Sequence, residues 1–168
     1  TAINLTAIEL PRLSVDIDLD FSENLSKDKI AEVKSKFTKR LTDYMWQEGY
    51  SLMVSPREHY ALLSFVFNYV NNAGNRDNIK IEINFMDRCH VLPLEQKSIM
   101  AKGMIEPFEI LALNNVELYA SKINALLSRA TPRDLYDVNA MIESDVKDTE
   151  LLKKCLIFYN MVGGEQDI

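Results

Sequence analysis

At 168 residues the chain is long enough to bury a core. Its composition, with 47% hydrophobic and 26% charged residues, is typical of a globular protein. The formal charge of −6 excludes a protein that coats nucleic acid without specificity, but it leaves room for a local basic patch. The longest apolar stretch, about 61–70, is interrupted by Ser64 and Asn68 and is too short to span a bilayer. Cys89 and Cys155 lack metal-ligand spacing and suggest reduced thiols, so we expect a cytoplasmic protein with no membrane partner.

The N-terminal stretch predicts an amphipathic helix over residues 1–10, ended by Pro11. Residues 11–21 then alternate with a period of two, which predicts a β-strand. One face would carry apolar side chains packed on a core (Val15, Ile17, Leu19, Phe21), and the other would carry carboxylates (Asp16, Asp18, Asp20). Carboxylates on one face of a strand lie roughly 7 Å apart and repel one another, which favours a site for a divalent cation such as Mg²⁺ or Mn²⁺.

Two other structures could carry this Asp-x-Asp-x-Asp pattern. An EF-hand loop requires Gly at its sixth position and Glu at its twelfth, where the chain has Phe21 and Lys27, so that loop is excluded. A solvated edge strand whose negative charge opposes aggregation remains open, above all for Asp20.

A long helix is predicted from about Lys27 to Glu48, with Ser26 as N-cap and Gly49 at its end. Its buried stripe would consist of Ile30, Val33, Phe37, Leu41, Tyr44 and Met45. Its outer face would carry Lys27, Lys29, Lys34, Lys36, Lys39 and Arg40. This face could bind a phosphate backbone, although the pattern favours a solvated helix surface.

A hairpin is predicted next, because two stretches rich in β-branched and aromatic residues flank a turn around Gly74. The strands would be 60–70 and 79–85. If the second strand pairs beside the acidic strand, Glu82 would share the face of Asp16 and Asp18 and supply a third carboxylate. An exposed glutamate without such a role is an equal alternative.

Residues 86–107 contain two prolines and a glycine that break any periodicity, so no element is predicted there. A short strand is predicted for 108–113. His59 and His90 have no partner at metal-ligand spacing and are interpreted as structural.

Asn114 or Asn115 would cap a helix that runs to about Ser128. Its apolar side would consist of Val116, Tyr119, Ile123, Leu126 and Leu127. Lys122 and Arg129 are seven residues apart and share a face, and Lys122 is expected at an exposed position away from the core.

Thr131 would cap the following helix, with Pro132 at its first position and Asp134 as the acid of a capping box. Asp137 would pair with Arg133 one turn away. These structural roles are sufficient to explain both aspartates without any catalytic function.

Two ordered signatures nevertheless resemble those of a known family. The first is Arg12-x-Ser14-x-Asp16-Ile17-Asp18-Leu19. The second is Lys122-Ile123-x-Ala125-Leu126-x-x-Arg129, followed after three residues by Arg133-Asp134-Leu135-Tyr136-Asp137. Between them lies the acidic strand Ile79-Lys80-Ile81-Glu82-Ile83. The chain resembles nucleotidyltransferase toxins of the abortive-infection AbiEii/AbiGii type, from type IV toxin–antitoxin pairs. In that family a Gly-Gly-Thr or Gly-Gly-Ser turn binds phosphate, so two glycines are expected just before Thr1. The chain as given is therefore expected to be truncated at its N-terminus, and to bind NTP weakly and transfer poorly by itself.

We expect an α+β fold, a nucleotidyltransferase-like small mixed sheet flanked by helices, with an α/β core over 1–113 and a helical part of the same domain over 114–168. A last helix is expected over about 150–162. The resemblance implies Mg²⁺- or Mn²⁺-dependent transfer of a nucleoside monophosphate from an NTP to an acceptor, with RNA such as tRNA as one option. It also implies a cognate antitoxin and a role in abortive phage infection.

The resemblance also implies the roles of the site residues. The catalytic residues would be Asp16, Asp18, Glu82, Lys122 and Asp134, and the first three of these would bind the metal. The nucleotide-binding residues would be Thr1, Arg12, Ser14, Lys122 and Arg129. Two other functions stay open: a non-catalytic binding module that keeps only the fold, and a nucleotidyltransferase that modifies small molecules such as antibiotics.

Overall fold

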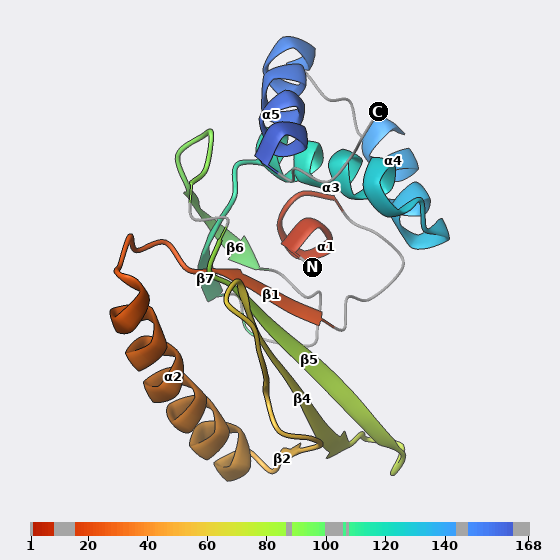
Figure 1. The fold of residues 1–168 in the computed structure, drawn as a ribbon. Helices are drawn as coiled ribbons and strands as arrows, with labels where there is room; N and C mark the ends of the chain where they lie inside the picture. Colours follow the sequence, from red (N-terminus) through yellow and green to blue (C-terminus); the bar gives the residue numbers. More distant parts are fainter. Residues whose placement is uncertain are drawn as a thin grey trace. The chain divides into compact units, whose positions relative to one another are not determined.

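The computed structural model describes residues 2–8, 16–86, 89–99, 106, 108–143 and 148–162. The chain forms two compact units, drawn in Figure 1. The sheet unit comprises Ser14–Cys89 together with Thr1, and the helical unit comprises Ala2–Leu13 and His90–Ile168. The N-terminal helix thus belongs to the second unit, although it precedes the first in sequence. The expected division of one domain at residue 113 stays a prediction.

The described residues of the sheet unit form one mixed sheet and one long helix. Its elements are β1 (Asp16–Asp20), α2 (Lys27–Gln47), β2 (Ser51–Leu52), β3 (Arg57–Glu58), β4 (Leu62–Val70) and β5 (Arg76–Asn84). The strand order is β1-β5-β4-β2, and β3 also pairs with β4. β1 runs parallel to β5, while the other pairs are antiparallel. The predicted hairpin is confirmed as β4 and β5, with Gly74 at a positive φ of 79° in the turn.

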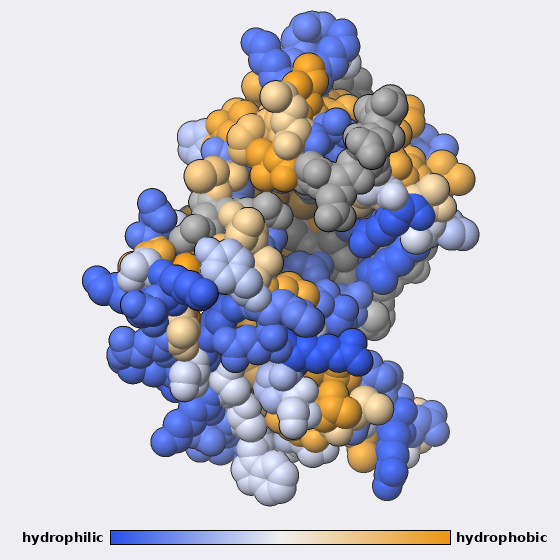
Figure 2. All heavy atoms as spheres, viewed as in Figure 1, coloured by the Kyte–Doolittle hydropathy of each residue, from blue (hydrophilic) through white to orange (hydrophobic). Residues whose placement is uncertain are grey.

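The core of the sheet unit lies between α2 and one face of the sheet (Figure 1). Alternate residues of the two central strands point to α2, because side chains on a strand alternate between its faces. The buried core residues are Ile30, Met45, Leu63, Phe65, Phe67, Ile81, Ile83 and Phe85. Figure 2 shows mainly hydrophilic side chains over the outer side of α2, as its amphipathic pattern predicts.

Two side chains of α2 differ from their expected places. Lys34 is buried, with only 3% of its surface exposed, although its charge predicts the outer face. Its Nζ donates hydrogen bonds to the carbonyls of His59 (2.5 Å) and Tyr60 (3.1 Å) and lies 4.7 Å from the Phe85 ring centroid. Position 34 belongs to the buried stripe because it lies one turn after Ile30, and a lysine stem can be buried when its ammonium finds acceptors. Tyr44, expected in that stripe, is 58% exposed.

The expected burial of the apolar face of β1 is wrong for two residues. Ile17 is 41% exposed and Leu19 is 45% exposed. The reason is that β1 stands at the end of the strand order, with β5 as its only partner among the described strands. Phe21, just after β1, does pack on the core, and its ring centroid lies 5.0 Å from that of Phe85. The part of the predicted strand over residues 11–15 lies outside the described residues.

In the part of the helical unit that the structure describes, there are four helices and a two-stranded antiparallel sheet. These elements are α1 (Ala2–Thr6), β6 (Glu95–Ile99), β7 (Phe108–Ala112), α3 (Asn115–Arg129), α4 (Pro132–Glu143) and α5 (Thr149–Val162). Ile3 is fully buried and belongs to one core cluster with Leu118, Tyr119, Val138 and Met141, so α1 packs through its apolar face as predicted. The Asn114 side chain caps α3 by accepting a hydrogen bond from the Val116 N–H (2.9 Å). Strand β6 was not expected from the sequence.

None of the helices in the described part of the chain is both long enough and apolar enough to cross a membrane.

Candidate active site

The expected carboxylates of β1 and β5 lie on one face of the sheet. In the parallel register, Asp18 is opposite Glu82, Asp16 is opposite Lys80 and Asp20 is opposite Asn84. Directly paired residues of neighbouring strands point to the same face. The prediction that Glu82 shares the face of Asp16 and Asp18 is therefore confirmed. Because Ile81 and Ile83 point into the core beside α2, this acidic face is the one directed away from α2.

These carboxylates are at least partly exposed, and one of them is paired with a lysine. Asp18 is exposed, while Asp16 and Glu82 are half-buried. Lys80 Nζ lies 2.8 Å from Glu82 Oε2, which reduces the repulsion between the carboxylates of this face. In the described ranges, no three His, Cys, Asp or Glu side chains are gathered in a group that could hold a metal ion by themselves.

Three of the expected nucleotide-binding residues, Thr1, Arg12 and Ser14, lie outside the described residues. Their roles stay predictions.

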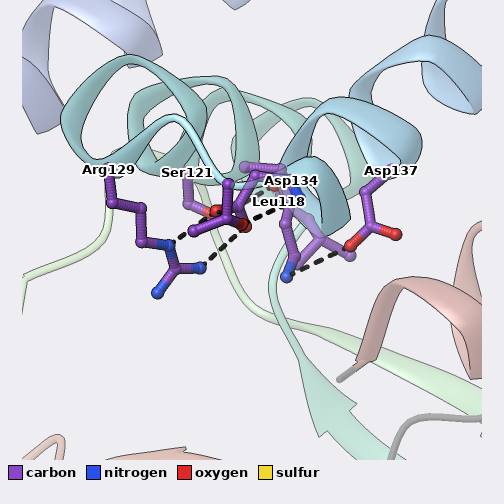
Figure 3. A network of polar contacts seen from close by, with 7 residues as sticks. Leu118, Ser121, Arg129, Asp134 and Asp137 are labelled. Atoms are coloured by element: carbon purple, nitrogen blue, oxygen red, sulfur yellow. Dashed lines mark hydrogen bonds and ion pairs between the residues drawn. The ribbon is translucent and has the colours of Figure 1, made fainter.

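The second group of expected site residues lies where α3 meets α4. Ala130, with a φ of 48°, ends α3 in the left-handed region, and Thr131 begins the next turn. The Arg129 guanidinium donates two hydrogen bonds to the Asp134 carboxylate, from Nε at 2.7 Å and from Nη2 at 2.8 Å (Figure 3). The Thr131 hydroxyl donates to the same carboxylate at 2.6 Å and accepts the Asp134 N–H at 3.3 Å. The predicted cap of α4 is thus confirmed.

This arrangement stabilises the ionised form of Asp134. The hydrogen bonds from Arg129 lower the pKa of the buried carboxyl from 3.8 to about 2, with further help from Thr131 and from the charges of Arg129 and Lys122, against the opposing effect of burial. Arg129 itself is 60% exposed in its side chain. One carboxylate therefore holds an accessible guanidinium in a fixed orientation.

The expectation that Lys122 is an exposed helix position is wrong. Its side chain is only 14% exposed, and its Nζ lies 3.8 Å from Oδ2 of Asp137, which is fully buried. Figure 3 shows Asp137 on α4, with its carboxylate directed toward α3. Lys122 is covered because α4 packs against α3 on that side. The sequence interpretation assigned Asp137 to Arg133 and so missed this pair across the two helices.

Glu117 is a buried carboxylate that the sequence did not single out. Its oxygens accept hydrogen bonds from the N–H groups of Val91 (2.8 Å) and Leu92 (2.9 Å) and from the Tyr159 hydroxyl (2.9 Å). Its place in the first turn of α3 gave only the ordinary signal of an acid near a helix N-terminus. Its contacts tie α5 and the segment before β6 to α3, which is a structural role.

A surface pocket of about 430 Å³ lies beside the N-terminal half of α2. Its lining consists of Lys27, Ile30, Ala31, Lys34, Glu58, His59 and Tyr60. It lies on the α2 side of the sheet, so it does not coincide with the acidic face of Asp18 and Glu82.

A small mixed sheet with acidic residues on adjacent parallel strands, followed by helices, is the α+β architecture expected of a nucleotidyltransferase. The profile of the family described as "Nucleotidyl transferase AbiEii toxin, Type IV TA system" matches residues 1–165, and the chain belongs to this family.

Among solved structures, the fold is similar to that of MenT4, nucleotidyltransferase toxin Rv2826c from Mycobacterium tuberculosis H37Rv, with a TM-score of 0.69 and 17% sequence identity. The similarity covers 95% of this chain and 53% of that one, so the chain spans about half the length of MenT4. The expected fold class is thereby confirmed. No curated protein sequence matches the chain.

Proposed function

We propose that this chain transfers a nucleoside monophosphate from an NTP to a hydroxyl of an RNA such as tRNA, in a Mg²⁺- or Mn²⁺-dependent reaction. It would act in the cytoplasm as a toxin of abortive phage infection, opposed by a cognate antitoxin. Family membership supports the reaction class. The observation that carries the proposal is the register of β1 and β5, which sets Asp18 directly beside Glu82 on one face of the sheet.

The residues of this face fit a hard divalent cation. Mg²⁺ in proteins is usually bound through one or two carboxylates together with phosphates of the substrate, so a complete cage of protein ligands is not required. Asp16, Asp18 and Glu82 supply carboxylates on neighbouring strands, and Asp18 is exposed. Bound there, Mg²⁺ would neutralise phosphate charge and lower the pKa of the acceptor hydroxyl.

The other site residues would act on the charge of the nucleotide. In the reaction, the acceptor oxygen forms a bond to the α-phosphorus. The bond between the α-phosphorus and the oxygen that bridges to the β-phosphorus breaks, pyrophosphate leaves, and the hydroxyl proton is released. Lys122 would neutralise charge on the triphosphate as a compact cation. Arg129, whose side chain is 60% exposed, would bind phosphate through its guanidinium, and Asp134 would set its orientation.

The test is transfer of label from each α-³²P-labelled NTP to bulk tRNA, with and without Mg²⁺. We expect label in the RNA with at least one NTP, and loss of label with a chelator. Asp18→Asn should remove transfer, because it deletes a carboxylate of the acidic face. Asp43→Asn is the matched control, since Asp43 is an exposed aspartate on α2. Equal transfer by the two variants would refute the proposed site.

A further inference from the structure

A row of polar residues crosses the sheet from β1 to β3. Asp18 on β1 is opposite Glu82 on β5, Glu82 is opposite Ser64 on β4, and Ser64 is opposite Arg57 on β3. Because directly paired residues share a face, all four side chains lie on the face directed away from α2. Glu58, the neighbour of Arg57, alternates to the other face and lines the pocket beside α2.

The row joins an acidic end to a basic end. Strands in a sheet lie about 4.8 Å apart, which puts the Cα of Arg57 roughly 10 Å from that of Glu82 and roughly 14 Å from that of Asp18. The two adjacent rows do not continue in this way, because Lys80 is followed on β4 by Val66, and Asn84 by Leu62. A basic side chain therefore extends the acidic face along the line of Asp18 and Glu82.

Arg57 is available for a ligand. It is exposed, and its guanidinium has no hydrogen-bond or ion-pair partner among the residues that the structure describes. A guanidinium binds phosphate through two parallel N–H groups, which gives both orientation and charge neutralisation. An anionic ligand group at this end of the row would therefore be held at a defined distance from the carboxylates.

We propose that Arg57 binds a backbone phosphate of the acceptor RNA, near the hydroxyl that reacts beside Asp18 and Glu82. This inference rests on the proposed function. The divalent cation bound at the acidic end would already neutralise nucleotide phosphates there, so the basic end serves a second source of negative charge. A polyanion supplies phosphates at such a distance from its reacting hydroxyl, whereas a small neutral acceptor does not. Arg57 is thus a residue for acceptor binding and not for binding the NTP.

The experiment compares three glutamine variants in transfer and in RNA binding. Arg57→Gln should raise the KM for tRNA by about tenfold, the size of one charge-assisted hydrogen-bonded contact, and leave the KM for NTP unchanged. Arg76→Gln is the control for position, because Arg76 is an exposed arginine at the far end of β5. Arg40→Gln tests the basic outer face of α2 as the alternative RNA surface. Arg57→Lys should restore part of the lost affinity.

Binding is measured without catalysis from the anisotropy of a fluorescein-labelled RNA hairpin with a single-stranded 3′ end. The affinity of Arg57→Gln should be about tenfold weaker, and the slope of log K against log salt should fall by about one, as for loss of one phosphate contact. Label transfer by the native protein, together with equally tight RNA binding by Arg57→Gln and Arg76→Gln, would overturn this inference and leave the proposed function intact. So would loss of affinity in Arg40→Gln only. Failure of the native protein to label RNA would instead refute the proposed function.

Discussion

The carboxylates of β1 and β5 differ in their environment from those of α3 and α4. On the sheet, Asp18 is exposed, and several like charges share one face, where Lys80 is paired with Glu82. In the helical unit, Asp134 and Asp137 are buried, and each lies beside a cation, Arg129 for the first and Lys122 for the second. One set thus carries several negative charges on a face in contact with solvent, and the other consists of buried carboxylates beside cations of the fold.

This difference separates two ways in which an acidic residue can serve a site. Exposed carboxylates that repel one another destabilise the protein slightly and gain from a bound cation. Buried carboxylates stabilise the fold only while their cationic partners remain, because a buried unpaired charge is costly. Substitutions in the first set should therefore affect activity without loss of stability, whereas substitutions in the second should affect both.

The strongest test of the comparison is the double variant Asp16→Asn/Asp18→Asn. Transfer should fall by about 10²-fold or more, as when a group that stabilises charge in a transition state is removed. In metal-free buffer the variant should be no less stable than the native protein, because repulsion is relieved. Mn²⁺ or Mg²⁺ should raise the Tm of the native protein and leave that of the variant unchanged. Thermal unfolding with and without metal is the measurement.

A large loss of stability in metal-free buffer would contradict this account. It would show that these aspartates support the fold and that the two sets of carboxylates do not differ as described. Asp43→Asn again serves as the control for loss of one exposed charge.

The second test removes the cation beside Asp137. Lys122→Met should destabilise the protein by about 3 kcal/mol, because a buried carboxylate loses a charged partner. The additional change Asp137→Leu should recover most of this loss, since a buried ion pair can often be replaced by apolar side chains. Urea unfolding of the single and double variants measures both effects.

Activity then distinguishes a structural lysine from one in the site. The double variant should stay at least tenfold slower in transfer even after its stability is recovered, if Lys122 contacts the triphosphate. Recovery of both stability and transfer would remove Lys122 from the site and leave the pair as a purely structural link between α3 and α4.

The third test uses pH. The pKa of Asp134 is lowered on folding from 3.8 to about 2, so the ionised carboxylate stabilises the folded state. This contribution is complete above the unfolded pKa and is lost as pH falls through the folded pKa. Over about pH 5 to pH 2, it corresponds to about 2 kcal/mol of unfolding free energy. Asp134→Asn should be less stable at neutral pH and should lose less stability on acidification over this window. An unchanged pH dependence would contradict the assigned pair.

Sequence patterns predicted the parts of the fold that rest on local periodicity. The strict alternation from Ile79 to Phe85 and the turn at Gly74 predicted the hairpin, and Thr131 followed by Pro132 predicted the start of α4. β6 was missed because the sequence Glu95–Ile99 has four polar residues in succession and no apolar alternation to mark a strand.

The candidate site was only partly predictable, because its geometry depends on contacts between distant segments. Alternation placed Asp16 and Asp18 on one face, but the exact partner of Asp18 follows from the register with β5. For the same reason the pair of Lys122 and Asp137 was missed, because it depends on how α4 packs against α3. Nothing in the sequence aligned Arg57 with Glu82, since two strand pairings separate them.

The smallest expected effect concerns Thr131, which connects the cap of α4 to the buried charge. Its hydroxyl accepts the Asp134 N–H and donates to the Asp134 carboxylate, so Thr131→Ala removes a helix cap and one hydrogen bond to a charged group. Loss of an N-cap typically costs about 1 kcal/mol. Thr131→Ser should be close to native, while Thr131→Val, which keeps the shape, should resemble alanine. Because the bidentate bonds from Arg129 remain, most of the lowering of the Asp134 pKa should persist, and NMR titration of that carboxyl tests this directly. A pKa restored to its ordinary value in Thr131→Val would mean that the hydroxyl, and not the guanidinium, maintains the buried charge.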